Sequence, residues 1–77
     1  MSLNYAKLNW KIAEVCGTQG NLARRIGLSE HTVSKKLSQK VEFKVSEILR
    51  IAEVLGLKSE DIGDYFFTVN TQNFEQT

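Results

Sequence analysis

Hydrophobic residues recur at helical spacing near the start of this chain. Steps of three or four residues place them on one face of a helix, and the polar residues between them face away. Asn4 suits the N-cap of such a helix, and Gly17 suits its end. Trp10 falls off the apolar stripe, and we expect it to be partly buried against the body of the protein. The stripe consists of Tyr5, Leu8, Ile12 and Val15.

Four further segments repeat this pattern and predict an all-α fold of five short helices. They cover about residues 19–26, 30–38 and 46–55, with a last helix that begins after Ser59. Thr18 and Ser29 are the expected N-caps of the first two. The expected inward positions are Leu22, Ala23, Ile26, Val33, Leu37, Ile48, Ile51, Ala52, Leu55, Ile62 and Phe66.

The last residues change in character. They are polar and rich in Thr, Asn and Gln, and Val69 and Phe74 stand alone among them as large apolar residues. We therefore expect one helical domain over residues 1–67 and an extended or partly disordered tail over 68–77.

Composition excludes several classes of protein. The chain has 77 residues, one Cys and one His. Cys16 can form no internal disulfide, and no metal-ligand cluster can be assembled from so few ligands. No apolar stretch has the roughly 20 residues that a membrane helix needs. We expect a cytoplasmic protein that is not an enzyme, with no cofactor and no small-molecule ligand.

Charge is unevenly distributed, although the formal net charge is only +1. Residues 17–44 carry six basic and two acidic side chains, whereas residues 45–77 carry two basic and six acidic ones. A protein polarised in this way can offer a basic face to a polyanion. The middle of the chain is therefore where a binding surface is expected.

The sequence between the second and third helices predicts a tight corner. Gly27, Leu28 and Ser29 form a three-residue turn that contains glycine, as in helix-turn-helix units. Ala23 is small enough for the next helix to cross closely, and Val33 is the apolar residue that would fill the crossing. The expected packing residues of this corner are Ala23, Gly27, Leu28, Val33 and Leu37.

Several short motifs in this order resemble the Cro and lambda-repressor type of helix-turn-helix domain, the Xre-like regulators of phages and bacteria. They are Thr18-Gln19, Leu22-Ala23, Ile26-Gly27-Leu28-Ser29, Thr32-Val33-Ser34 and Ile51-Ala52-x-x-Leu55-Gly56-Leu57. The resemblance implies a five-helix DNA-binding domain that acts as a dimer on a palindromic operator. Two features depart from the pattern: Gly20, where a good helix former is usual, and the order Lys36-Leu37 at the end of the third helix.

The resemblance and the helical wheel together predict which side chains would touch double-stranded DNA. The exposed residues of the first turns of the third helix would contact base edges in the major groove. Basic and polar residues around them would contact the backbone. The predicted base contacts are Glu30, His31, Ser34 and Lys35, and the predicted backbone contacts are Gln19, Arg24, Lys36, Ser38, Lys40 and Lys44.

A homodimer interface is expected near the end of the fifth helix. Tyr65, Phe66 and Phe67 place three aromatic residues in a row, and one helix can bury only part of such a run internally.

Two functions from different classes fit these features. The first is a sequence-specific transcriptional regulator, a Cro-like phage or bacterial repressor, that inserts the helix Glu30–Ser38 into the major groove. The alternative is a protein-interaction module of the same fold, antitoxin-like or an anti-regulator, without strong DNA binding. The acidic residue in the third helix and the low overall charge favour this alternative. Binding to random duplex DNA that weakens with salt would distinguish the two.

Overall fold

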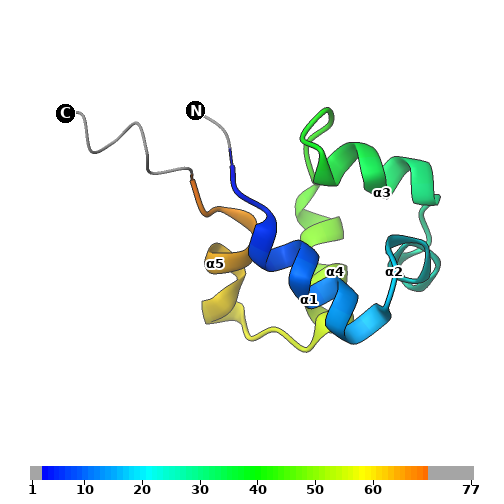
Figure 1. The fold of residues 1–77 in the computed structure, drawn as a ribbon. Helices are drawn as coiled ribbons and strands as arrows, with labels where there is room; N and C mark the ends of the chain where they lie inside the picture. Colours follow the sequence, from blue (N-terminus) through cyan, green and yellow to red (C-terminus); the bar gives the residue numbers. More distant parts are fainter. Residues whose placement is uncertain (1–2, 70–77) are drawn as a thin grey trace.

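The computed structural model describes residues 3–69, and within them five α-helices and one short 3-10 turn enclose a single core (Figure 1). This confirms the predicted all-α class. The prediction of an extended or partly disordered tail concerns mainly residues 70–77, which lie outside the described residues. The elements are α1 (Ala6–Cys16), α2 (Gln19–Ile26), α3 (Glu30–Leu37), α4 (Val45–Leu55), the 3-10 turn Ser59–Asp61 and α5 (Ile62–Phe66).

Local chemistry explains where α2 and α3 begin. The Thr18 hydroxyl accepts a hydrogen bond from the backbone N–H of Asn21, and the Ser29 hydroxyl accepts one from that of Thr32, both at 3.1 Å. Each cap satisfies a donor that the first turn of a helix leaves free. The chain turns sharply after α2 because Gly27 adopts the left-handed conformation, with φ 76°.

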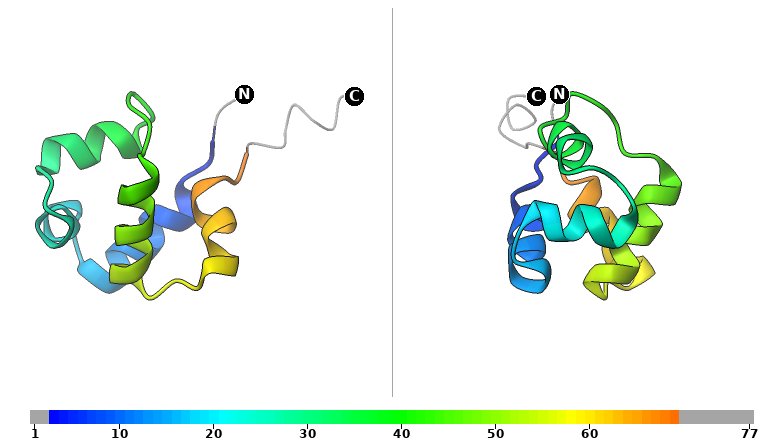
Figure 2. Two further views of the ribbon diagram at one scale, coloured as in Figure 1. Left: turned by 180° about the vertical axis from the view of Figure 1, so that it is seen from behind. Right: turned by 90° about the vertical axis from the view of Figure 1, so that its right-hand side faces the viewer.

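The core lies where α1, α2 and α4 meet, and α1 and α4 lie on opposite sides of it (Figure 2). Apolar residues from all five helices contribute to it. The most deeply buried large side chains are Phe66, Leu8, Leu22, Ile51 and Val33.

Two expectations for α1 were wrong. Trp10 is 63% exposed, because the buried residues of α1 follow one another at steps of four along the opposite side of the helix. Val15 is also exposed, since Cys16 continues the row formed by Leu8 and Ile12. The helix starts one residue later than predicted, although the Asn4 side chain still accepts a hydrogen bond from the N–H of Ala6.

The two ends of the described chain lie side by side (Figure 1). Leu3 and Val69 form an isolated antiparallel bridge, and the N–H of Asn4 donates to the carbonyl of Thr68 at 2.7 Å. Residues 68 and 69, the first two of the expected tail, are therefore paired with the N-terminal segment, and the division between domain and tail at residue 67 stays a prediction.

Candidate functional site

The corner between α2 and α3 has the close crossing that its residues suggest. Ala23 and Val33 are 1% and 0% exposed, Leu37 is buried, and Leu28 packs half-buried against the core. Arg50 of α4 adds a contact that the sequence pattern did not indicate: its guanidinium donates to the carbonyl of Ile26 at 3.1 Å. This bond satisfies a carbonyl at the end of α2 and ties the corner to α4.

The outer face of α3 is polar and exposed. All four predicted base-contacting residues, Glu30, His31, Ser34 and Lys35, are exposed, as are Arg24, Ser38, Lys40 and Lys44, while Gln19 is half-buried. The Glu30 carboxylate is turned back over Gly20, since a Cβ atom built on Gly20 would lie 3.3 Å from it. The unusual glycine of α2 therefore lets the first side chain of α3 approach α2 closely.

One predicted backbone contact is contradicted by the structure. Lys36 is 4% exposed, and its ammonium group lies 2.6 Å from a carboxylate oxygen of Glu47 and donates to the carbonyl of Glu42 at 3.3 Å. The side chain points inward because the order Lys36-Leu37 places both residues on the packed side of α3. Lys36 joins α3 to the start of α4 and offers no charge to a partner.

The predicted dimer interface is also only partly available. Phe66 is 1% exposed and belongs to the core, so its prediction as an interface residue was wrong. Tyr65 is half-buried, and the Lys7 ammonium lies over its ring, 4.7 Å from the centroid. Phe67 alone of the three is largely exposed, at 57%. Association of two chains stays a prediction.

A groove of about 410 Å³ lies between the paired chain ends and the α3–α4 connection, residues 38–44. We call it the aromatic groove, because three rings in edge-to-face contact form much of its wall. Phe43 lies edge-on to Tyr5, with centroids 5.8 Å apart, and to Phe66, with centroids 5.5 Å apart. The lining residues are Leu3, Tyr5, Gln39, Val41, Glu42, Phe43, Ile48, Phe66 and Phe67.

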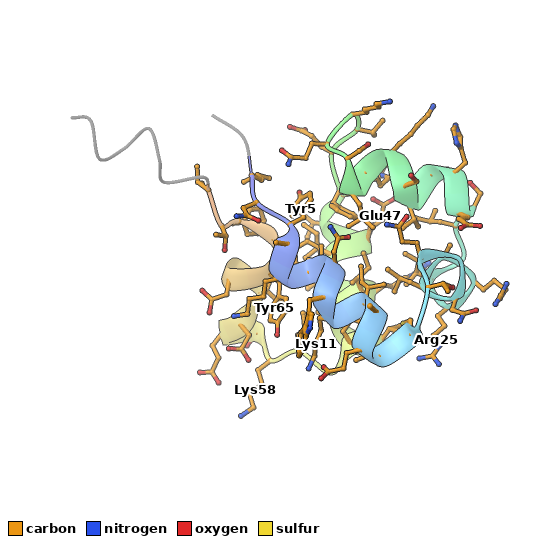
Figure 3. The ribbon with its side chains drawn as sticks, in the orientation of Figure 1. Tyr5, Lys11, Arg25, Glu47, Lys58 and Tyr65 are labelled. Carbon is orange, nitrogen blue, oxygen red and sulfur yellow. The ribbon has the colours of Figure 1, made fainter. Side chains whose placement is uncertain are left out.

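Hydrogen bonds hold the walls of the aromatic groove in place. The Gln39 side-chain amide donates to the carbonyl of Leu3 at 2.6 Å, and its oxygen accepts from the N–H of Leu3 at 3.0 Å. Gln39 is also the one non-glycine residue among residues 3–69 with positive φ, at 66°. On the α4 side, Glu47 accepts from the N–H of Lys44 at 2.8 Å as well as from Lys36. Tyr5 and Glu47 both lie on the side where α3 ends and α4 begins (Figure 3).

The groove combines apolar walls with an acidic edge. Burial of the Tyr5 hydroxyl, followed by the nearby charge of Glu42, raises the pKa of the phenol above its ordinary value of 10.0. Tyr5 therefore stays neutral near pH 7 and can serve as a hydrogen-bond donor. Val41 and Phe67, 45% and 57% exposed, present apolar surface at the rim.

Sequence reasoning missed the aromatic groove. Its walls come from the first residues, from the α3–α4 connection and from the end of α5, and no local motif joins these three segments. A signal was present in the apolar residues Val41 and Phe43, which interrupt an otherwise polar connection between two helices.

The structure is therefore that of a small all-helical domain with two surface features, the polar outer face of α3 and the aromatic groove. No group of three or more His, Cys, Asp or Glu side chains in residues 3–69 is arranged to hold a metal ion. Within the same residues, no helix is long and apolar enough to cross a bilayer.

A family model described as "Protein of unknown function (DUF739)" matches residues 1–69. The chain belongs to this family. It is also similar to a solved structure, the modulator of repression (MOR) of the temperate bacteriophage TP901-1 from Lactococcus lactis. The two sequences are 54% identical, the match covers 87% of this chain and 90% of the other, and the TM-score is 0.77. No curated protein matches the sequence.

These findings correct two predictions. The assignment to the Xre-type helix-turn-helix repressors was wrong, since the matching family is a different one. The main functional prediction, a repressor that binds an operator, was also wrong, because the similar structure is that of a modulator of repression. Double-stranded DNA as the partner is accordingly unsupported, and the alternative, a protein-interaction module, is the better interpretation.

Proposed function

We propose that this chain is an anti-regulator type of interaction module that binds a repressor protein and so modulates repression. The observation that carries the proposal is the 54% identity, over 87% of this chain, to a protein named as a modulator of repression. At this identity the two proteins have a common ancestor, and we infer that they bind the same class of partner.

The aromatic groove is the contact site that we propose for the repressor. Binding sites in proteins are usually concave and mainly apolar, with a few polar groups that orient the occupant. The rings of Tyr5, Phe43 and Phe66 supply the apolar wall, and the carboxylate of Glu42 and the amide of Gln39 lie beside them. Phe67 and Val41 expose apolar surface beside this wall, and a partner seated in the groove would bury both of them.

The outer face of α3 extends the proposed interface. Glu30, His31, Ser34 and Lys35 are exposed along this helix, which leads directly into the connection that walls the groove. In our proposal these side chains contact the protein partner instead of base edges. They would form a polar rim, where single charges contribute to association rate and specificity more than to affinity.

Calorimetric titration of the full chain with the repressor encoded in the same genome tests the proposal. We expect a stable complex, and we expect Phe67→Ala or Val41→Ser to weaken it at least about 10-fold, because each removes apolar surface that the repressor would bury. Trp10→Ala and Leu49→Ser are matched controls. They remove side chains that are equally exposed, at 63% and 57%, but that do not line the groove.

Two results would contradict the proposal. One is the absence of any complex with the repressor, and the other is an equal effect of the groove variants and the control variants. A parallel titration with random duplex DNA at low salt should show no binding by this chain alone. Salt-sensitive binding there would instead support a nucleic-acid partner.

A further inference from the structure

The aromatic groove opens where the described part of the chain ends. Leu3 and Phe67 line the groove, and Val69 is paired with Leu3. Val69, the last described residue, therefore lies next to a residue that lines the groove. The family match also ends at residue 69, so these eight residues lie outside the part that this chain shares with the family model.

Residues 70–77 contain one large apolar side chain, Phe74. It lies five residues beyond Val69, and an extended chain covers roughly 3.3–3.6 Å per residue, so Phe74 can reach any point within roughly 17 Å of the rim. The groove volume, about 410 Å³, is within the range of roughly 300–1,000 Å³ found for small-ligand sites. One aromatic side chain of the chain's own tail fits both the reach and the volume.

The chemistry of the two partners is complementary. A phenyl ring entering the groove would meet Tyr5 and Phe43, and aromatic rings favour edge-to-face contacts of the kind already present there. Among residues 3–69, Glu42 is the one charged residue that lines the groove, so the proposed contact depends on the aromatic rings.

We propose that Phe74 of this chain occupies the aromatic groove and competes there with the repressor. The competition, but not the contact itself, rests on the function proposed above. Because a short tether keeps the tail at a local concentration in the millimolar range, even a weak contact of one ring is populated. Removal of the ring should then make the groove more available, and repressor binding should tighten about three-fold.

NMR spectroscopy of the full-length chain tests the contact directly. We expect nuclear Overhauser effects between the Phe74 ring and the rings of Tyr5 and Phe43. Phe74→Ala should shift the amide signals of Val41 and Phe43 well beyond the shifts caused by the control variant Gln76→Ala, which alters the same tail without removing the ring. Neither variant changes a residue of the folded part, so both are expected to fold.

Two NMR results would overturn the proposal. The first is the absence of these Overhauser effects together with equal shifts in the two variants. The second is their appearance only between molecules in a mixture of labelled and unlabelled chains, which would assign the groove to a second copy.

Titration with the same repressor separates this inference from the proposed function. If the NMR contact is absent but the repressor still binds and responds to Phe67→Ala, the inference fails while the function stands. If the contact is present but no repressor binds, the function fails and the tail contact stands. Unchanged repressor affinity in Phe74→Ala, in the presence of the contact, would overturn the competition.

Discussion

The α2–α3 corner and the aromatic groove are built in opposite ways. The corner is made by consecutive residues: two capped helices and a glycine turn, with Ala23 and Val33 closely packed between them. The groove is made by residues up to 64 positions apart, from Leu3 to Phe67, that only the complete fold brings together. The corner is thus the more recognisable feature of the sequence, whereas the groove is visible only in the folded chain.

The comparison shows how a familiar local motif can mislead about function. A helix-turn-helix corner is a packing solution, and its residue pattern reports the geometry of two helices. What the helices bind depends on the surface around them. In this chain the basic residue Lys36 of α3 forms an internal ion pair with Glu47, so its charge does not face a partner. The aromatic groove lies directly beyond the end of that helix.

The largest effect is expected at the ion pair that supports the groove. Glu47→Ala leaves the buried ammonium group of Lys36 without its carboxylate, which should cost about 3 kcal/mol of unfolding free energy. Urea denaturation measures this loss. Glu53→Ala, an exposed carboxylate on the same helix, should change stability by less than about 0.5 kcal/mol. Equal effects of the two variants would mean that the pair does not support the α3–α4 connection.

Acid should remove part of the same stabilisation. Burial raises the pKa of the Glu47 carboxyl, but the hydrogen bonds from Lys36 and from the N–H of Lys44 outweigh it, so the pKa lies below its ordinary value of 4.5. A group whose pKa is lower in the folded state stabilises the fold above its unfolded pKa. That contribution disappears as the pH falls through the folded pKa. Below about pH 4.5, the urea midpoint should therefore fall more steeply for the native chain than for Glu47→Ala. Identical acid dependence would exclude Glu47 as a source of this effect.

A smaller effect is expected where the groove is tied to the N-terminal segment. Gln39→Ala removes the two hydrogen bonds between its side chain and the backbone of Leu3. At about 0.5–1.5 kcal/mol for each bond, the loss should be about 1–3 kcal/mol in total. Hydrogen exchange at the amide of Leu3 should speed up accordingly. Lys40→Ala, exposed in the same connection, serves as the control and should leave that exchange rate unchanged.

The smallest effect concerns the corner. Gly20→Ala should raise stability by up to about 1 kcal/mol, since alanine is the better helix former and the flexible end of Glu30 can move a few tenths of an ångström aside. Gly27→Ala should instead lower the thermal midpoint, because Gly27 has φ 76°, which an alanine side chain disfavours. A destabilised Gly20→Ala would show that the approach of Glu30 to α2 stabilises the corner.

The accuracy of the sequence-based predictions follows the same division. Thr18 and Ser29 were identified as caps because a cap depends on neighbours three residues away. The inward residues Leu22, Val33 and Ile51 were identified because apolar residues recur every three or four positions in a helix that buries one face. The placement of Trp10 and Lys36 was wrong, since each depends on which other element lies opposite, whereas Phe66 lies in the core, at the inward position expected for it.

By itself, the sequence determined five helices, the caps of α2 and α3 and the close crossing of these two helices, because helical periodicity, capping and the conformation of glycine are properties of short stretches of chain. The tertiary structure alone decided that Gln39 pairs with Leu3, that Lys36 is neutralised by Glu47, and that three distant aromatic residues form one groove. These contacts depend on the relative placement of whole elements, which follows from packing of the complete core and is not encoded in any one segment.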